Sequence, residues 1–361
     1  MQFSHKRLIR RNRLLELIYE YRGIEGKTIF QKLVYFLSVN EIEYFDYDFI
    51  KHNYGPYSDV LEEDINILYN DGLIKVDKLN GKTRIIPNKE KINSYFEENE
   101  IKFQTDRKDD LIESKIINLF ADNLKTTKRI ELAATIHFLT ITEKNPFKEK
   151  IFNIIEVWKP KRFRKKEKEE IWEILVTQKL IKQEIIKLNE FAEQLKQLKS
   201  GNDDAHNFHR LSKRILSYLF SDQLKNFKLE ENINLGRKRV DICAYNISQK
   251  GFFFNLKNIH DIKCPYIIFE CKNYTNDLDN PAYDQIGMRL YDDIGKFGII
   301  ICRQIKDQTK LMNILKDILT KKKEYVIVIE DKDLIEMLLL KLNNKSPDKI
   351  LEQKLKELLF L

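Results

Sequence analysis

The segment YIIFECKNYTNDL, residues 266–278, begins as an apolar run and ends in charged and polar side chains. Side chains two positions apart on a strand point to the same face. Glu270 and Lys272 are therefore expected to project together, while Phe269 and Cys271 face the other way. The apolar residues before them predict a strand that is buried in a core. The sequence thus places a carboxylate and an ammonium group where a central strand leaves that core.

A second apolar run, KRVDICAYN at residues 238–246, contains one carboxylate, Asp241, between Val240 and Ile242. An isolated buried charge is costly unless it is paired or binds a metal ion. No obvious partner other than a cation is apparent for Asp241 or Glu270. If the two strands are neighbours, both carboxylates converge with Lys272 and can hold a hard divalent cation through oxygen.

This pattern resembles the PD-(D/E)XK nucleases, and in particular their Mrr-like, restriction-endonuclease-like branch. Four segments follow the order found in that branch, within residues 201–333: GRKRVDI, IFECKNY, DQIGMRL and KFGIIICR. The resemblance implies an α/β restriction-endonuclease-like core with a mixed central sheet, which agrees with the strands and helices that alternate after residue 201. It also implies a Mg²⁺ (or Mn²⁺) cofactor and DNA as the partner.

The resemblance assigns roles to individual residues. The metal ligands would be Asp241, Glu270 and the backbone carbonyl of Cys271, and the catalytic set would be Asp241, Glu270, Lys272 and Gln285. Lys272 would orient the attacking water and offset charge on the phosphate. Gln285 would face the site from the following helix. Arg289, one turn further on, could hold a phosphate.

The sequence also departs from the family pattern. Val240 stands before Asp241, where the family has proline. His209 occupies the place on the first helix where related enzymes often carry a glutamate that binds metal. Glu230 or Glu231, on the preceding strand, is the candidate substitute.

We therefore expect a metal-dependent endonuclease that hydrolyses DNA phosphodiester bonds, in restriction or defence. The alternatives are a catalytically silent regulator that binds DNA, and an RNA-cleaving effector that an activating protein partner releases. The formal net charge of +8 permits an anionic partner but does not require one.

Residues 1–100 are typical of a small helical unit closed by a hairpin. Ser58 is expected to cap an acidic helix, and Asn80-Gly81 is a strong signal for a hairpin turn. Together with the later segments WKPKRF and IWEILVTQKLI, this region resembles the winged-helix regulators of bacteria and archaea, more weakly than the C-terminal half resembles nucleases. The acidic helix is a poor candidate to read DNA, so a role in protein contact stays open.

Four segments are expected along the chain: a winged-helix-like domain at 1–100, a second helical or winged-helix-like domain at 101–181, a linker helix at 182–200 and a nuclease domain at 201–361. Apolar residues from Ile181 to Leu195 recur at steps of four and three, which predicts a narrow apolar stripe. We expect a homodimer, formed through this helix or through the N-terminal region. The alternative is that the stripe packs against the N-terminal helices of its own chain.

The four cysteines form no Cys-x-x-Cys pair and lie in or beside apolar runs, as is typical of a reduced protein. The N-terminus lacks the apolar core of a signal peptide. No apolar run approaches the roughly 18 residues needed to span a bilayer. We therefore expect a cytoplasmic protein without membrane contact.

Overall fold

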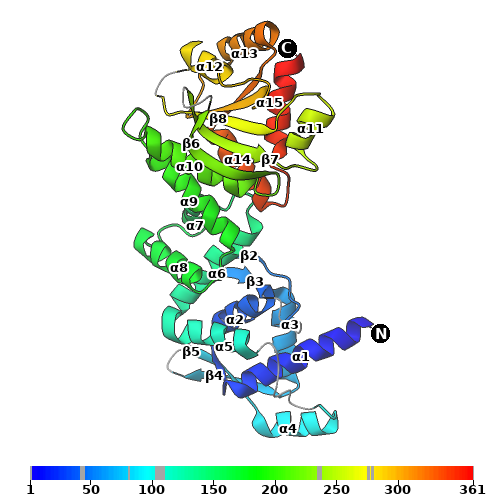
Figure 1. Cartoon of the computed structure of the whole chain (residues 1–361). Helices are drawn as coiled ribbons and strands as arrows, with labels where there is room; N and C mark the ends of the chain where they lie inside the picture. Colours follow the sequence, from blue (N-terminus) through cyan, green and yellow to red (C-terminus); the bar gives the residue numbers. More distant parts are fainter. Residues whose placement is uncertain are drawn as a thin grey trace. The chain divides into compact units, whose positions relative to one another are not determined.

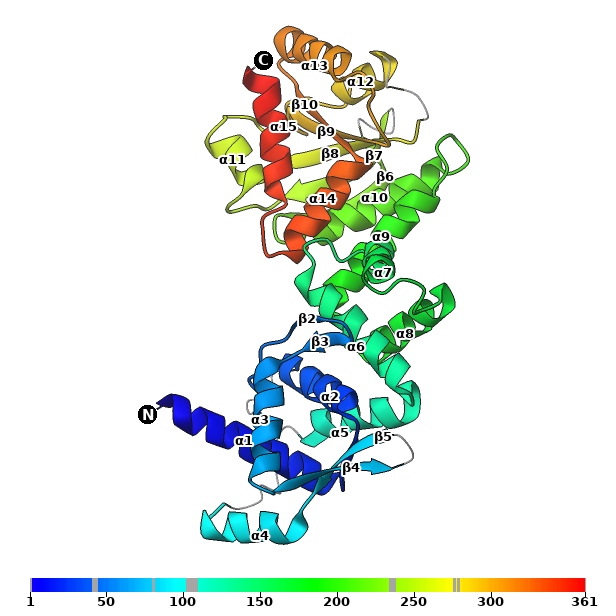
Figure 2. The same cartoon turned by 180° about the vertical axis from the view of Figure 1, so that it is seen from behind.

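The computed structural model describes residues 2–40, 45–79, 82–101, 110–233, 238–274, 277 and 280–360. They form two compact units, Met1–Lys182 and Gln183–Leu361 (Figures 1 and 2).

The first unit is mainly helical, with short strands. Its elements are α1 (Gln2–Glu20), β1 (Ile24–Glu25), α2 (Lys27–Val39), β2 (Ile50–His52), β3 (Gly55–Tyr57), α3 (Asp59–Asn70), β4 (Ile74–Leu79), β5 (Lys82–Pro87), α4 (Lys89–Glu98), α5 (Asp110–Asn118), the π-helical turn η1 (Leu119–Leu124), α6 (Thr127–Thr142), α7 (Lys148–Trp158) and α8 (Lys165–Thr177).

Helix α6 lies at the centre of the first unit and is buried on all sides between Ile130 and Thr140. It packs against α2, α7, α8 and β3. Within it, burial lowers the pKa of His137 to about 4, so the imidazole is neutral at physiological pH. The Tyr35 hydroxyl lies 2.8 Å from Nδ1, and Nε2 lies 3.0 Å from the Leu180 carbonyl oxygen. Because a carbonyl can only accept, Nε2 carries the proton and Nδ1 accepts from Tyr35. This imidazole ties α2, α6 and the segment after α8 together.

The expected hairpin is present. Strands β4 and β5 pair antiparallel, and β1 adds to β5 to give the order β1-β5-β4. The turn residues Asn80 and Gly81 lie outside the described residues. The predicted cap of α3 is confirmed, because the Leu61 N–H donates to the Ser58 hydroxyl over 3.3 Å.

The second unit is an α/β structure. Its elements are α9 (Gln183–Gln197), α10 (Ala205–Leu219), β6 (Leu224–Ile233), β7 (Lys238–Asn246), α11 (Phe252–Asn258), β8 (Tyr266–Lys272), α12 (Asn280–Gly287), β9 (Phe297–Cys302), α13 (Gln308–Lys322), β10 (Tyr325–Glu330), α14 (Asp331–Leu342) and α15 (Asp348–Phe360).

These strands form one five-stranded mixed sheet of order β10-β9-β8-β7-β6. Strands β6, β7 and β8 pair antiparallel, whereas β8, β9 and β10 pair parallel. Almost every residue of β8, β9 and β10 is buried, so both faces of these strands are covered. Helix α10 packs on β6, β7 and β8, α12 on β8, and α13, α14 and α15 on β10. The predicted fold class, a helical N-terminal region and an α/β core with a mixed central sheet, is confirmed.

The two units differ from the four expected segments. Helix α6 packs on α2 and β3, so residues after 101 share a core with those before 100. Helix α9, the expected linker, packs on α10 and α14 and begins the second unit.

The apolar stripe of α9 is covered by its own unit. Ile185, Leu188 and Leu195 are all buried. The stripe is therefore not available to a second chain, and the homodimer expected from it loses its basis. Its packing on α10 and α14 also differs from the expected packing on the N-terminal helices. Within the described ranges, no helix is long and apolar enough to cross a membrane.

We expect the substitution Leu188→Glu to destabilise the second unit, because it replaces a side chain that is 1% exposed with a carboxylate. The loss should be about 3 kcal/mol or more in the free energy of unfolding. Urea denaturation followed by circular dichroism measures it. Gln183→Glu, at an exposed position of the same helix, is the matched control and should unfold like the wild type. A stable Leu188→Glu protein whose oligomeric state has fallen would contradict this packing.

Candidate active site

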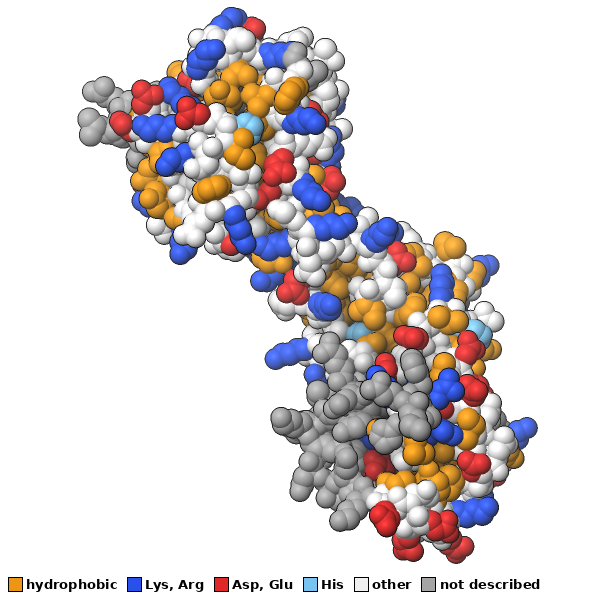
Figure 3. All heavy atoms as spheres, turned by 90° about the vertical axis from the view of Figure 1, so that its right-hand side faces the viewer, with side chains coloured by type: hydrophobic (Ala, Val, Ile, Leu, Met, Phe, Trp, Pro, Cys, Tyr) orange, Lys and Arg blue, Asp and Glu red, His pale blue; other side chains and the backbone are white. Residues whose placement is uncertain are grey.

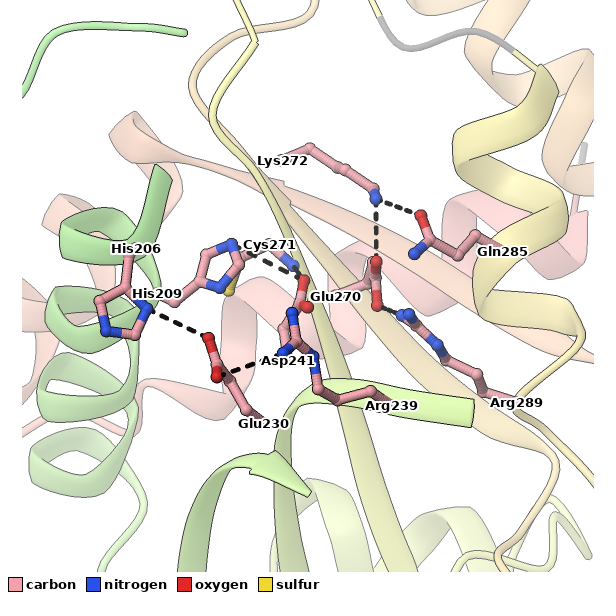
Figure 4. Close-up of polar contacts among 10 residues, drawn as sticks. All are labelled: His206, His209, Glu230, Arg239, Asp241, Glu270, Cys271, Lys272, Gln285 and Arg289. Carbon is pink, nitrogen blue, oxygen red and sulfur yellow. Dashed lines mark hydrogen bonds and ion pairs between the residues drawn. The ribbon is translucent and has the colours of Figure 1, made fainter. Parts of the chain in front are cut away.

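Strands β7 and β8 separate at one end, and the candidate site lies at that separation. Their ladder ends with Ile242 opposite Phe269. Beyond this pair, β7 continues beside β6 and β8 continues beside β9. The Asp241 side chain takes over where the ladder stops, because the Cys271 N–H donates to its Oδ2 over 2.9 Å (Figure 4). A carboxylate inside an apolar run thus satisfies a backbone donor that the strand separation leaves without a ladder partner.

Glu270 is the most deeply buried group of the site. Its side chain is 0% exposed and forms ion pairs with the Lys272 ammonium, at 2.8 Å, and with the Arg289 guanidinium. Lys272 also donates to Oε1 of Gln285 on α12. The structure therefore brings Glu270, Lys272 and Gln285 into one connected network, next to the strand end that carries Asp241 (Figure 4).

This network corrects two expectations. The carboxylates do have partners other than a metal cation: the Cys271 N–H for Asp241, and two cations for Glu270. Arg289 lies in the turn after α12, which ends at Gly287, rather than on the helix face of Gln285. Its buried guanidinium pairs with Glu270 instead of facing outward to a phosphate. Burial lowers the pKa of Arg289, and the nearby charge of Asp241 opposes that shift.

Two histidines of α10 line the other side of the site. His209 Nε2 lies 3.8 Å from Asp241 Oδ2. Burial lowers the pKa of His209 below its usual value, although Asp241 and Glu230 act to raise it. His206 Nδ1 lies 3.1 Å from Glu230 Oε1, and Arg239 lies on the other oxygen of Glu230 at 3.5 Å. Sequence reasoning assigned no partner to these histidines or to Arg239.

Of the two glutamates expected to replace the missing helix carboxylate, only Glu230 joins this group. Glu231 pairs with Lys228 at 2.8 Å. Glu230 has a φ of 53°, in the left-handed region that glutamate seldom adopts. Leu229 and Glu231 pair with Ile242 and Val240, so the β6–β7 register places Glu230 opposite Asp241, on the same face of the sheet. The Glu230 side chain therefore lies on the face of Asp241, where His206 of α10 contacts it.

The oxygen donors of the site suit a hard divalent cation. Asp241 and Glu270 offer carboxylates, and the Cys271 carbonyl is expected on the same strand edge as its N–H, beside Asp241. The set of side-chain metal ligands is less complete. In the part of the chain that the structure describes, no three His, Cys, Asp or Glu side chains are grouped as metal ligands. A divalent ion at this place would therefore have two carboxylates and one backbone carbonyl oxygen as ligands. To bind it, Glu270 would have to give up an ion pair with Lys272 or Arg289.

Comparison with known proteins leaves the family open. No protein-family model matches the chain. No curated protein matches it either. Two structures of the restriction endonuclease FokI, one free and one bound to DNA, are 11% and 10% identical to it. Their TM-scores are 0.36 and 0.34, and each comparison covers 97% of this chain and 72% of the other. Similarity at this level does not establish a shared activity.

In metal-free protein, the two carboxylates should differ in their effect on stability. Glu270→Gln leaves two buried cations without a counter-charge, and breaking a buried pair in this way costs about 3–5 kcal/mol. Asp241→Asn keeps an oxygen that can accept from the Cys271 N–H, so it should cost about 1 kcal/mol or less. Urea denaturation in the presence of EDTA measures both losses.

The double variant Glu270→Gln/Arg289→Met provides the control for charge. It removes one of the two uncompensated cations and should recover part of the lost stability. Equal destabilisation by the two single variants, or no recovery in the double variant, would contradict the pairing described here.

Proposed function

We propose that this protein is a metal-dependent endonuclease that hydrolyses DNA phosphodiester bonds. The observation that carries the proposal is the convergence of Asp241, Glu270 and Lys272 where β7 and β8 separate. Two carboxylates and a lysine at adjoining strand ends provide the groups that metal-assisted phosphodiester hydrolysis needs. The order of the mixed sheet supports the resemblance to the PD-(D/E)XK nucleases. A setting in restriction or defence is inferred from that resemblance alone.

Each residue then has a role in the reaction. Asp241, Glu270 and the Cys271 carbonyl would hold Mg²⁺ or Mn²⁺. The bound ion would polarise a phosphoryl oxygen and lower the pKa of its water. Lys272 would orient the attacking water and offset negative charge on the phosphate. Gln285 would position Lys272, since it already accepts a hydrogen bond from the ammonium group.

We propose that the start of the first unit has a winged-helix-like fold. The order α1-β1-α2-α3-β4-β5, with β1 paired to β5, supports that assignment. The β2–β3 hairpin is an addition between α2 and α3. The charges of α3 do not favour DNA reading by this helix. Asp59 and Glu63 are exposed on it, and Asp64 is buried against Arg10.

One observation favours the second candidate, a silent regulator that binds DNA. Lys272 and Arg289 engage both oxygens of Glu270, so this carboxylate is already compensated in the absence of metal. In an inactive descendant of a nuclease, such an ion-pair network would keep the fold without any metal. Activity measurements separate the two candidates.

We expect the purified chain to cleave plasmid DNA with Mg²⁺ or Mn²⁺ and not with EDTA. Lys272→Ala should reduce the rate by about 10²–10³, because one cationic group that stabilises developing charge is removed. Gel electrophoresis of supercoiled plasmid over time measures nicking and linearisation. Single-stranded and duplex RNA, assayed in parallel, test the RNA-cleaving alternative.

A matched control is available in the same unit. Lys332 pairs with Glu330, whose side chain is also buried, at 2.6 Å. Lys332→Ala therefore removes a lysine from a buried glutamate without touching the site, and it should cleave like the wild type. Metal-independent cleavage, or full activity of folded Lys272→Ala, would rule out the proposed mechanism. DNA binding without any cleavage would favour the silent regulator.

A further inference from the structure

A strongly basic surface lies on the first unit. It consists of residues 157–166, which join α7 to α8, and of the β2–β3 hairpin at residues 50–57; we call it the basic-aromatic surface. Residues 157–166 read VWKPKRFRKK and contain no Asp or Glu. Their cations are Lys159, Lys161, Arg162, Arg164, Lys165 and Lys166. On the face of the molecule drawn in Figure 3, acidic and basic side chains are interspersed.

A single buried carboxylate holds this segment in place. Glu131 of α6 is 1% exposed and pairs with both Lys159 and Arg162. The Arg162 Nε donates to Glu131 Oε1 over 2.9 Å. One negative charge therefore faces two positive charges, and the local excess is cationic. The pKa of buried Lys32 reflects this, because burial and then the charge of Lys159 lower it to about 7.

Aromatic rings join the two parts of the surface. The Lys51 ammonium lies 4.4 Å from the ring centroid of Trp158. The Arg162 guanidinium carbon lies 5.5 Å from the ring centroid of Tyr54, a residue that is 52% exposed. Each contact links the hairpin to residues 157–166 through a cation on a ring face. The rings thus fix cations in position.

The remaining cations are free to meet a ligand. Lys161, Lys165 and Lys166 are exposed, and none of them forms an ion pair with the residues that the structure describes. The flanking acids Glu156 and Glu167 accept from the backbone N–H groups of Lys161 and Arg164, and their side chains also pair with lysines outside the segment. Glu156 pairs with Lys168 at 3.2 Å, and Glu167 pairs with Lys128 at 2.8 Å.

We propose that the basic-aromatic surface binds the sugar-phosphate backbone of duplex DNA without reading its sequence. Clustered, unpaired cations on a fixed segment match a regular polyanion, and backbone contacts of this kind position a protein without specifying bases. Tyr54 and Trp158 each have a cation on one face, which favours backbone binding over the stacking of unpaired bases. This inference deepens the proposed function and rests on it for the choice of DNA.

The test is the salt dependence of DNA binding by the full chain. Fluorescence anisotropy of a labelled duplex of mixed sequence, in EDTA to prevent cleavage, gives the binding constant at several salt concentrations. In the triple variant Lys161→Gln/Lys165→Gln/Lys166→Gln, the slope of log K against log salt should shrink by about 3. The affinity near 0.1 M salt should fall by roughly 100-fold. A duplex of different sequence should give the same result.

The matched control makes the same change in charge on the second unit. Lys250, Lys345 and Lys349 are exposed, and their replacement by glutamine should leave the slope unchanged. The proposal is overturned if the first triple variant keeps the wild-type slope, or if both variants lose it equally. It is also overturned if the lost affinity is for single-stranded DNA and not for the duplex. If the wild type shows the predicted slope but cleaves nothing with Mg²⁺ or Mn²⁺, the proposed nuclease activity is wrong, whereas DNA binding by the basic-aromatic surface is supported.

Discussion

The buried carboxylate of Glu270 is the constraint on which the arrangement of the site depends. A fully buried charge must be compensated, and removing one partner of such a pair costs more than the pair itself contributes. Lys272 is two residues away on the same strand and can reach Glu270 locally. Arg289 comes from beyond α12, so its ion pair fixes where the turn after that helix must lie. The ion pair between Glu270 and Arg289 thus helps to orient α12, the helix that also carries Gln285.

The separation of β7 from β8 depends on how the backbone hydrogen-bonding groups at the strand ends are satisfied. Continuous pairing would satisfy the backbone of both strands but leave no room for side chains between them. Separation leaves backbone groups of β8 that need other partners, and Asp241 supplies one for the Cys271 N–H. The same carboxylate therefore stabilises the separation and contributes an oxygen to the space that the separation creates. His209, at 3.8 Å from Asp241, lies at the α10 side of that space.

The parts of this arrangement that follow from strand periodicity could be predicted from the sequence. Glu270 and Lys272 share a face and touch, and β7 and β8 are neighbours as expected. The ion pair of Arg289 could not be predicted, because helical spacing from Gln285 fails once α12 ends at Gly287. The choice between Glu230 and Glu231 depended on the register of β6 against β7, which places Glu230 opposite Asp241 and which periodicity along one strand does not give. The apolar stripe of α9 was visible in the sequence, but periodicity does not name the surface that covers it.

Charge is used in opposite ways in the two units. At the candidate site, Lys272 and Arg289 are buried and paired with Glu270, so they contribute little to attraction at long range. Around residues 157–166 of the first unit, one buried glutamate anchors two cations, and several others stay exposed. Exposed cations act through the field they project into solvent, whereas buried pairs act only on groups that enter the site. In the proposed nuclease, the attraction of a polyanion would thus be separate from the chemistry performed on it. That separation is consistent with a modest net charge of +8, because attraction depends on where the cations cluster and not on their total.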